Sequence, residues 1–291
     1  MTLTRRYTLA ALFPALLLML ALVAFPTIFI FTLSFRDYVL TDMTSPRGFV
    51  GFANYARLLG DSRFASAAGR TGVFVLLSVG TSLVAGLALG KLLTTKARGV
   101  GFLRTVMIVP MVITPLVVGA AFRFMLDYDL GVVNWFLSTI GLPKLGWLSQ
   151  ATLALPTAAL VDAWQWTPFV ALVVAAGLES IPTDPIEAAQ VDGANWFQEL
   201  RYVTLPLLRP LLVVVLLIRT MDAFREFDKI YIMTAGGPGT SSETLPIYVW
   251  RAAFNYYNMG YAAAAGVVML IGITVVSALM VGRTRALEVD R

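Results

Sequence analysis

Six long apolar runs, separated by loops that hold most of the charge, constrain the fold of this chain more than any other feature. A helix needs roughly 20 mostly apolar residues to cross a bilayer, and it satisfies its own backbone polar groups there. The sequence therefore predicts an all-α membrane protein with six transmembrane helices. The expected spans are Leu9–Ser34, Thr71–Gly90, Thr105–Phe122, Ala151–Leu178, Leu205–Phe227 and one within Ala252–Gly282.

The expected organisation is a single transmembrane domain over residues 1–291. Residues 1–70 would form the first span and an outer loop, 71–282 the other spans, and 283–291 a cytoplasmic tail. The first run could instead be a cleaved secretory signal, because it follows two arginines. Its length and its prolines, Pro14 and Pro26, favour a retained helix.

Composition excludes several classes of protein. Charged residues make up 13% of the chain and hydrophobic residues 58%, whereas soluble domains carry roughly 25% charge. The chain has no Cys and no His, so disulfides, thiolate nucleophiles, imidazole bases and the usual zinc ligands are excluded. The net charge of +5 is scattered between apolar runs, which indicates the flanks of membrane helices and no nucleic-acid partner.

The basic residues predict which side of the membrane each loop occupies, because cytoplasmic loops carry an excess of Lys and Arg. A model with both termini in the cytoplasm places most of them inside: Arg5, Arg6, Lys91, Lys96, Arg98, Arg104, Arg201, Arg209, Arg283, Arg285 and Arg291. The first loop disagrees, since it would lie outside and yet holds Arg36, Arg47, Arg57, Arg63 and Arg70. We keep this orientation because the reverse would place the basic loop at residues 91–104 outside.

The loop at residues 180–206 is polar and contains helix start and stop signals. Asp184 can cap a short helix that has Pro185 at its first position and Glu187 three residues after the cap. Gly193 can end this helix, because glycine readily takes a positive φ. We therefore expect a short exposed helix here.

A second short helix should follow, capped by Asn195 with Gln198 three residues later. Leu205-Pro206 then marks the start of the next membrane helix. Ala188 and Ala189 keep one side of the first helix slim, so that helix could enter a narrow groove on a partner. The alternative is an ordinary pair of helices at the membrane surface.

The residue order in this loop resembles a family motif: E-A-A, three residues, G, nine residues, an aliphatic residue, one more, then L-P. It runs from Glu187 to Pro206, and its one mild departure is Val203, where isoleucine is common. The chain resembles, over nearly its whole length, a permease subunit of carbohydrate-type binding-protein-dependent ABC importers, in the maltose/glycerol-phosphate class. Three further segments resemble the family's G-x-x-N-Y, F-x-x-F-D and T-x-G-G-P: Gly51–Tyr55, Phe224–Asp228 and Thr234–Pro238.

This resemblance implies the type I importer permease fold, a bacterial cytoplasmic (inner) membrane location and a complex. The family pairs two different permease subunits with two ATP-binding subunits and an external substrate-binding protein, and this chain is similar to the first permease. In the family the E-A-A helix docks in a groove of the ATPase and transmits its closure. By resemblance, the coupling role falls to Glu187, Ala188, Ala189, Asp192, Gly193, Leu205 and Pro206.

No ATP site is visible in the chain itself. A phosphate-cradling loop needs G-x-x-x-x-G-K-[ST], and the only Gly-Lys, Gly90-Lys91, is followed by Leu92 and lacks the first glycine. We therefore expect no enzyme activity, no cofactor and no metal in this chain, with ATP and Mg²⁺ on the partner subunits.

Span five carries several charges, which are costly inside a membrane and usually face protein or water. Arg219, Asp222, Arg225 and Glu226 lie three and four residues apart, which places them along one helix face. One interpretation is a structural stripe in which Arg219, Asp222 and Arg225 pair with each other. The resemblance favours a substrate pathway for Asp222 and Arg225.

Span four supplies the other half of the expected pathway. It carries Asp162 and then Gln165, Trp166 and Phe169, so that rings can stack on the C–H faces of a sugar while polar groups bind its hydroxyls. We expect Gln165, Trp166, Phe169, Asp222 and Arg225 to line a path for a sugar or polyol. Trp164 could equally pack in the core or face lipid.

Three prolines, Pro110, Pro115 and Pro168, lie within expected spans. They interrupt helix hydrogen bonding, and the simpler interpretation is a static kink rather than a hinge for alternating access.

Two other functions fit the sequence less well. An ion-driven secondary transporter of a small polar solute would often contain internal repeats; none is evident here, and the coupling loop would have no role. A membrane enzyme would depend on Asp, Glu or Ser, and no spaced catalytic motif stands out. The exact substrate is open among disaccharides, monosaccharides, polyols and glycerol phosphodiesters, although Asp222 and Glu226 favour a neutral ligand.

Overall fold

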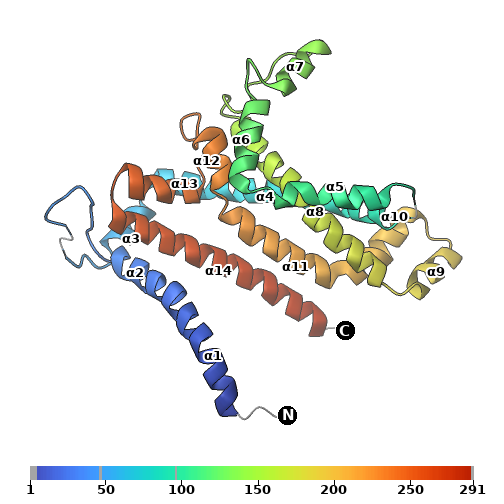
Figure 1. Ribbon diagram of the computed structural model, residues 1–291, viewed down its shortest axis with the longest axis horizontal. Helices are drawn as coiled ribbons and strands as arrows, with labels where there is room; N and C mark the ends of the chain where they lie inside the picture. Colours follow the sequence, from blue (N-terminus) through green and yellow to red (C-terminus); the bar gives the residue numbers. More distant parts are fainter. Residues whose placement is uncertain (1–4, 46–47, 96, 290–291) are drawn as a thin grey trace. The chain divides into compact units, whose positions relative to one another are not determined.

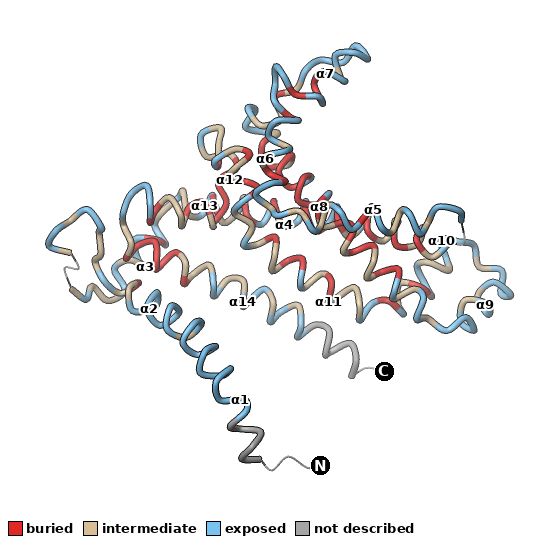
Figure 2. The backbone as a smooth tube through the Cα atoms, viewed as in Figure 1, coloured by how far each residue is buried: buried red, intermediate tan, exposed pale blue. Residues whose placement is uncertain are grey.

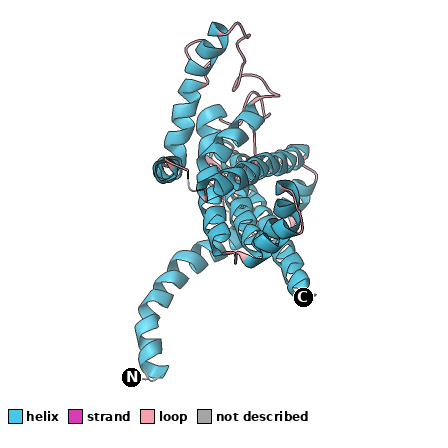
Figure 3. Ribbon diagram, turned by 90° about the vertical axis from the view of Figure 1, so that its right-hand side faces the viewer, coloured by secondary structure: helices cyan, strands magenta, loops and turns pink. Residues whose placement is uncertain are grey.

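The computed structural model describes residues 5–45, 48–95 and 97–289, which form helices and loops with no β-strand among them (Figure 3). The prediction of an all-α protein is confirmed. The chain divides into two compact units, one of Met1–Ala65 with Tyr248–Gly272 and one of Ser66–Ile247 with Ile273–Arg291. Among the basic residues used for orientation, those outside the described residues or with undescribed side chains are Arg5, Arg6, Arg47, Lys96, Arg283, Arg285 and Arg291.

The first unit begins with the first expected span. Helices α1 (Arg5–Met19) and α2 (Phe25–Ser34) are joined by one π-helical turn, and residues Ala11–Ser34 are long and apolar enough to cross a membrane (Figure 1). None of the most apolar window of this span is buried within the chain. Its side chains are therefore available to lipid or to another subunit.

The Gly51–Tyr55 segment closes the first loop onto the end of α2. The Asn54 side-chain amide donates to the carbonyl oxygens of Ser34 at 2.9 Å and Arg36 at 3.0 Å, and the hydroxyls of Tyr55 and Ser34 are 2.7 Å apart. Gly51 has a φ of +58°, which favours glycine. The segment then continues as α3 (Ala53–Leu59).

The remaining helices complete the set of spans. They are α4 (Ser62–Leu93), α5 (Val100–Val112), α6 (Pro115–Met125), α7 (Val132–Thr139), α8 (Ala154–Ser180), α9 (Asp184–Val191), α10 (Trp196–Glu199), α11 (Leu205–Phe224), α12 (Asp228–Thr234), α13 (Leu245–Trp250) and α14 (Met259–Val289). Within the part of the chain that the structure describes, five helical runs are long and apolar enough to span a membrane, and the pair α5 and α6 makes a sixth if it counts as one span. Helix α14 extends through the first seven residues of the expected tail at 283–291.

The third span differs from the expected kinked helix. Helices α5 and α6 are bent by 98° relative to each other. The break falls at Ile113 and Thr114, which both have extended backbone, because Pro115 disfavours helical backbone in the residue before it. By contrast, Pro110 lies inside α5 and Pro168 inside α8, and both helices continue past them.

Helix α8 lies at the centre of the second unit, and most of its length is buried (Figure 2). Helices α5 and α11 pack against it, and α12 packs against both α6 and α8. Small residues let membrane helices approach closely: a Cβ added at Gly86 of α4 would lie 2.5 Å from Val170 of α8, and one at Gly90 would lie 2.6 Å from Val174.

The segment Thr234–Pro238 forms the turn after α12. The Thr234 hydroxyl lies 2.7 Å from the Ser242 hydroxyl and accepts from the Gly236 amide at 3.2 Å. Ala235 and Gly236 both have positive φ, at 50° and 83°. A tight turn therefore directly follows α12, the helix that carries Lys229 of the candidate site.

Candidate functional site

A group of buried ionic side chains lies at the heart of the second unit. Asp162 of α8 accepts from Arg219 of α11 at 2.6 Å through Oδ2 and lies 2.6 Å from Lys229 Nζ of α12 through Oδ1. The Ser78 hydroxyl of α4 also donates to Oδ2. Asp162, Arg219, Lys229 and Ser78 are all at most 1% exposed. One carboxylate therefore ties four helices together.

Lys229 extends this ionic network towards the break in the third span. Its Nζ is 2.9 Å from Glu226 Oε2 and donates to Gln165 Oε1 at 2.9 Å. The Gln165 amide nitrogen in turn donates to the Ile113 carbonyl at 2.8 Å. A carbonyl at the end of α5 is thus satisfied by a side chain.

The charges of this network balance, with Asp162 and Glu226 opposite Arg219 and Lys229. A buried ion pair adds little net stability, but removal of one partner typically costs about 3–5 kcal/mol, because a charge is left uncompensated. The expected stripe of Arg219, Asp222 and Arg225 is therefore wrong for Arg219, which pairs with Asp162 instead. Sequence spacing showed a shared helix face but not a partner on another helix.

Asp222 and Arg225 form a separate, accessible ion pair. The Arg225 Nη2 donates to Asp222 Oδ1 at 2.6 Å, and the two side chains are 64% and 28% exposed. Arg225 ends α11, where the backbone leaves helical geometry. Both side chains are therefore accessible, so either could bind a ligand in place of the other.

The two aromatic residues expected in the pathway lie together on α8. The rings of Trp166 and Phe169 meet edge to face with centroids 6.2 Å apart, and both side chains are half-buried. The Arg219 guanidinium lies 5.2 Å from the centre of the Trp166 ring, within the range of a cation–π contact. Arg219 Nε and Nη1 have no hydrogen-bond acceptor among the described residues. Trp166 thus covers the otherwise unsatisfied side of this buried guanidinium.

Gln165 is placed differently from the other pathway residues. It is 1% exposed, and its amide is bonded on both sides by Lys229 and Ile113. In this structure it belongs to the buried network, beneath the half-buried Trp166 and Phe169. A role for Gln165 in contacting a substrate stays a prediction.

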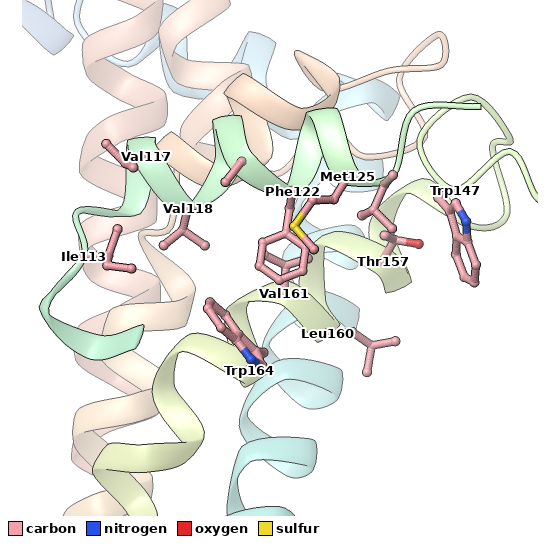
Figure 4. Close-up of a pocket in the computed structure, with 12 residues that line it drawn as sticks. Ile113, Val117, Val118, Phe122, Met125, Trp147, Thr157, Leu160, Val161 and Trp164 are labelled. Carbon is pink, nitrogen blue, oxygen red and sulfur yellow. The ribbon is translucent and has the colours of Figure 1, made fainter. Parts of the chain in front are cut away.

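An apolar cavity of about 540 Å³ lies between α6 and α8 (Figure 4). Trp164 lines it and packs edge to face on Phe122, with ring centroids 5.0 Å apart. Apart from the indole N–H groups of Trp147 and Trp164, its only polar side chain is that of Thr157. A sugar would find few partners for its hydroxyls here, so Trp164 is separate from the polar pathway residues.

The coupling loop folds into the two expected short helices, with one correction. The N-cap of α9 is Thr183, whose side chain makes no cap hydrogen bond, and Asp184 is already helical. Because Pro185 lacks an N–H, it fits the first turn beside Asp184. Gly193 ends the segment with a φ of +81°, as expected. Asn195 and Gln198 form the predicted capping box of α10.

Helix α9 projects from the fold: every one of its residues is exposed or only partly buried, and Val191 is 88% exposed. Glu187 and Ala188 are exposed and Ala189 is half-buried. Asp192 and Gly193 follow on the surface.

The base of α9 is fixed to the end of α4. Gln190 donates to Glu199 Oε2 at 3.4 Å, and Glu199 Oε1 is 3.8 Å from Lys91 Nζ. Lys91 also lies 5.2 Å from the Trp196 ring centre. A π-helical turn, Leu200–Thr204, leads directly into α11, with Leu205-Pro206 in its first turn. The exposed loop is therefore joined to α4 by these contacts and to α11 by the chain itself.

Sequence reasoning missed Lys229 and Ser78. A signal for Lys229 was available: Asp162 lies alone in a long apolar span, and a buried carboxylate needs a cation from another segment. Lys229, followed by Ile-Tyr-Ile-Met, is a charge next to an apolar run. Ser78 carries no such signal, because serine is common in membrane helices.

The chain is similar to known transport proteins. Residues 82–285 match the family model described as "Binding-protein-dependent transport system inner membrane component". The trehalose/maltose transport system permease protein MalF of Thermococcus litoralis is 35% identical, over 94% of this chain and 92% of its own length. The sulfoquinovosyl glycerol transport system permease protein SmoG of Agrobacterium fabrum is 34% identical, over 88% and 83%.

The fold is shared with a bacterial ABC transporter that imports the acidic polysaccharide alginate. The TM-score is 0.82 at 24% identity, covering 97% of this chain and 96% of that one. The six-span type I importer permease fold is thereby confirmed. The chain belongs to the family of inner membrane components of binding-protein-dependent transport systems.

Proposed function

We propose that this chain is one of two different permease subunits of an ATP-driven importer, and that it forms part of the pathway for a sugar or polyol delivered by an external binding protein. The proposal is carried by two observations on neighbouring membrane-spanning helices: the half-buried aromatic pair Trp166 and Phe169 on α8, and the accessible ion pair of Asp222 and Arg225 at the end of α11. Two similar permeases, from Thermococcus litoralis and Agrobacterium fabrum, are named for trehalose/maltose and for sulfoquinovosyl glycerol.

Chemistry supports a polyhydroxylated ligand. Aromatic faces accommodate the C–H surfaces of a sugar, and the carboxylate of Asp222 and the guanidinium of Arg225 can accept from and donate to its hydroxyls. The buried network behind them holds Trp166 through Arg219. A neutral ligand is favoured, because the accessible charges at this surface are already paired.

Coupling is assigned to the exposed helix α9. Glu187, Ala188 and Ala189 would enter a groove on an ATP-binding subunit, while Asp192, Gly193 and Leu205-Pro206 shape the return to α11. Two such ATP-binding subunits would hold ATP and Mg²⁺, and this chain would perform no bond chemistry. Closure of the ATPases would turn the translocation pathway from inward facing to outward facing, and ATP hydrolysis would return it to the inward-facing state.

The test is ATPase activity of the complete importer in lipid, with its binding protein and a panel of sugars and polyols. We expect stimulation by one loaded binding protein, and loss of most of that stimulation with Glu187→Ala. Asp129→Ala is the matched control, because it removes an exposed carboxylate from the loop before α7, far from Glu187 along the chain. Wild-type stimulation in the Glu187 variant would remove the coupling role. Failure of the folded chain to co-purify with any ATPase would favour the ion-driven transporter.

The proposed orientation, with both termini in the cytoplasm, has its own test. The chain has no native Cys, so single Asp129→Cys and Asp192→Cys variants report one side each. A membrane-impermeant maleimide applied to intact cells should label Asp129→Cys and spare Asp192→Cys. The opposite labelling pattern would reverse the topology.

A further inference from the structure

The first unit contains a polar cavity of about 280 Å³ that is separate from the proposed pathway. It is formed by the end of α3, the start of α4, the turn after α13 and the start of α14. Three arginines line it against one carboxylate, and its walls include Arg57, Asp61, Arg63, Tyr248, Arg251 and Tyr261. The cavity therefore carries an excess of positive side chains.

Its one carboxylate is committed to other groups. Asp61 Oδ2 accepts from the hydroxyls of Tyr248 at 2.6 Å and Tyr261 at 2.8 Å. Asp61 Oδ1 accepts from the backbone amides of Arg63 at 2.8 Å and Phe64 at 3.2 Å. Both oxygens of the carboxylate are thus used to hold tyrosines and the start of α4.

The arginine side chains are placed by aromatic rings. The Arg57 guanidinium lies 4.7 Å from the centre of the Tyr261 ring, and its side chain is exposed. Arg63 Nη1 donates to the Tyr256 hydroxyl at 2.8 Å. Stacking of Arg57 on the Tyr261 ring leaves the edge of its guanidinium fork, with its N–H donors, able to face an oxyanion.

The cavity lies at the ends of two helices that are long and apolar enough to span a membrane. Asp61 directly precedes the span Ser62–Leu93, and Asn258, another wall residue, directly precedes the span Met259–Gly282. The segment before α14, which supplies part of the wall, carries three exposed aromatic side chains of the kind found in the headgroup region: Phe254, Tyr256 and Tyr257.

We propose that this cavity binds a phosphate oxyanion carried by the headgroup of an anionic phospholipid. Guanidinium groups match phosphate geometry with two parallel hydrogen bonds, and the flanking rings and apolar spans suit the rest of the lipid. The proposal gives a role to Arg57 and Arg63. Both lie in the first loop, which the preferred orientation places outside the cell even though it is rich in arginine. It does not depend on which solute is transported.

Native mass spectrometry of the purified full chain tests this proposal. The chain is titrated with phosphatidylglycerol or phosphatidylcholine, with and without inorganic phosphate. We expect retention of phosphatidylglycerol over phosphatidylcholine, and about fivefold weaker retention for Arg57→Gln, since one basic residue near a membrane surface is worth about that factor. Arg57→Lys should keep only part of the binding, because an ammonium group retains the charge but not the two parallel hydrogen bonds.

Arg98→Gln is the matched control, because it removes an exposed arginine beyond the other end of α4. Thermal unfolding of each variant shows that it is folded. Equal phosphatidylglycerol retention in wild type and Arg57→Gln would overturn the site. Binding of inorganic phosphate without selective retention of phosphatidylglycerol would keep the oxyanion chemistry but overturn the lipid as its source. Unchanged lipid retention with weakened binding of the external binding protein would reassign the cavity to a protein partner.

Discussion

The ammonium group of Lys229 lies 2.6 Å from Oδ1 of Asp162, and both side chains are at most 1% exposed. This contact joins α12 to the middle of α8 and completes a network with as many positive as negative groups. Because Lys229 also binds Gln165, which holds the end of α5, the same cation supports the break in the third span. The network also reaches the proposed substrate pathway, because the Arg219 guanidinium lies against the ring of Trp166.

Replacement of Lys229 with methionine should be strongly destabilising. Asp162 would keep Arg219 as its partner, but Glu226 would lose the cation it pairs with. An uncompensated buried charge costs about 3–5 kcal/mol. Thermal unfolding in detergent measures the loss. Arg225→Met, which breaks an exposed pair, is the control and should cost at most about 1 kcal/mol.

The double variant Lys229→Met with Glu226→Gln restores the charge balance of the network. It should therefore recover part of the stability that the single variant loses. A double variant as unstable as Lys229→Met alone would show that the packing and hydrogen bonds of the ammonium group, and not its charge, matter.

The spans and the coupling loop were predictable from sequence because their signals are local. Apolar run length indicates a membrane helix, and Gly193 and the Asn195–Gln198 capping box act within a few residues. Five of the six expected spans correspond to long helices, and the sixth is the broken pair α5 and α6.

The partners within the site were not predictable, because they come from distant segments. Arg219 and Asp222 lie one helical turn apart on α11, yet Arg219 pairs with Asp162, which is 57 residues away in the sequence. The break at Ile113 and Thr114 was only half predicted: Pro110 and Pro115 gave the same signal, but only Pro115 begins a new helix. Packing between α8 and α11 decides the pairing of Arg219, and at the break Gln165 of α8 donates to the Ile113 carbonyl.

Close packing of α4 on α8 predicts a position-specific effect of one added methyl group. Gly86→Ala would place a Cβ 2.5 Å from Val170 Cγ1 and should destabilise the protein by about 1–3 kcal/mol. Gly80→Ala on the same helix is the control, because no described heavy atom lies within 4 Å of its added Cβ. Similar thermal unfolding of the two variants would contradict this account of the α4–α8 contact.

Asp222→Asn should affect transport far more than stability. Its ion pair with Arg225 is accessible to solvent, and such pairs contribute about 0–1 kcal/mol to stability. If Asp222 contacts the substrate, the variant loses this contact. The KM of uptake by the reconstituted importer should then rise by about tenfold, for one lost hydrogen bond to a charged group. Unchanged uptake in the folded variant would remove Asp222 from the pathway.

Asp61 predicts a specific pH dependence of stability in the first unit. Partial burial raises the pKa of its carboxyl, but the hydroxyls of Tyr248 and Tyr261 and the backbone amides of Phe64 and Arg63 outweigh burial and lower it below the ordinary value of 3.8. The carboxylate therefore stabilises the folded state at pH values above 3.8, and this stabilisation is lost as the pH falls through the lower folded-state value. The melting temperature of Asp61→Asn should be lower than that of the wild type at pH 6, and the two should converge below pH 3.8. Asp129→Asn, at an exposed site, controls for the general effect of removing a carboxylate. A difference between wild type and Asp61→Asn that stays constant down to pH 2 would show that the charge of Asp61 does not stabilise this unit.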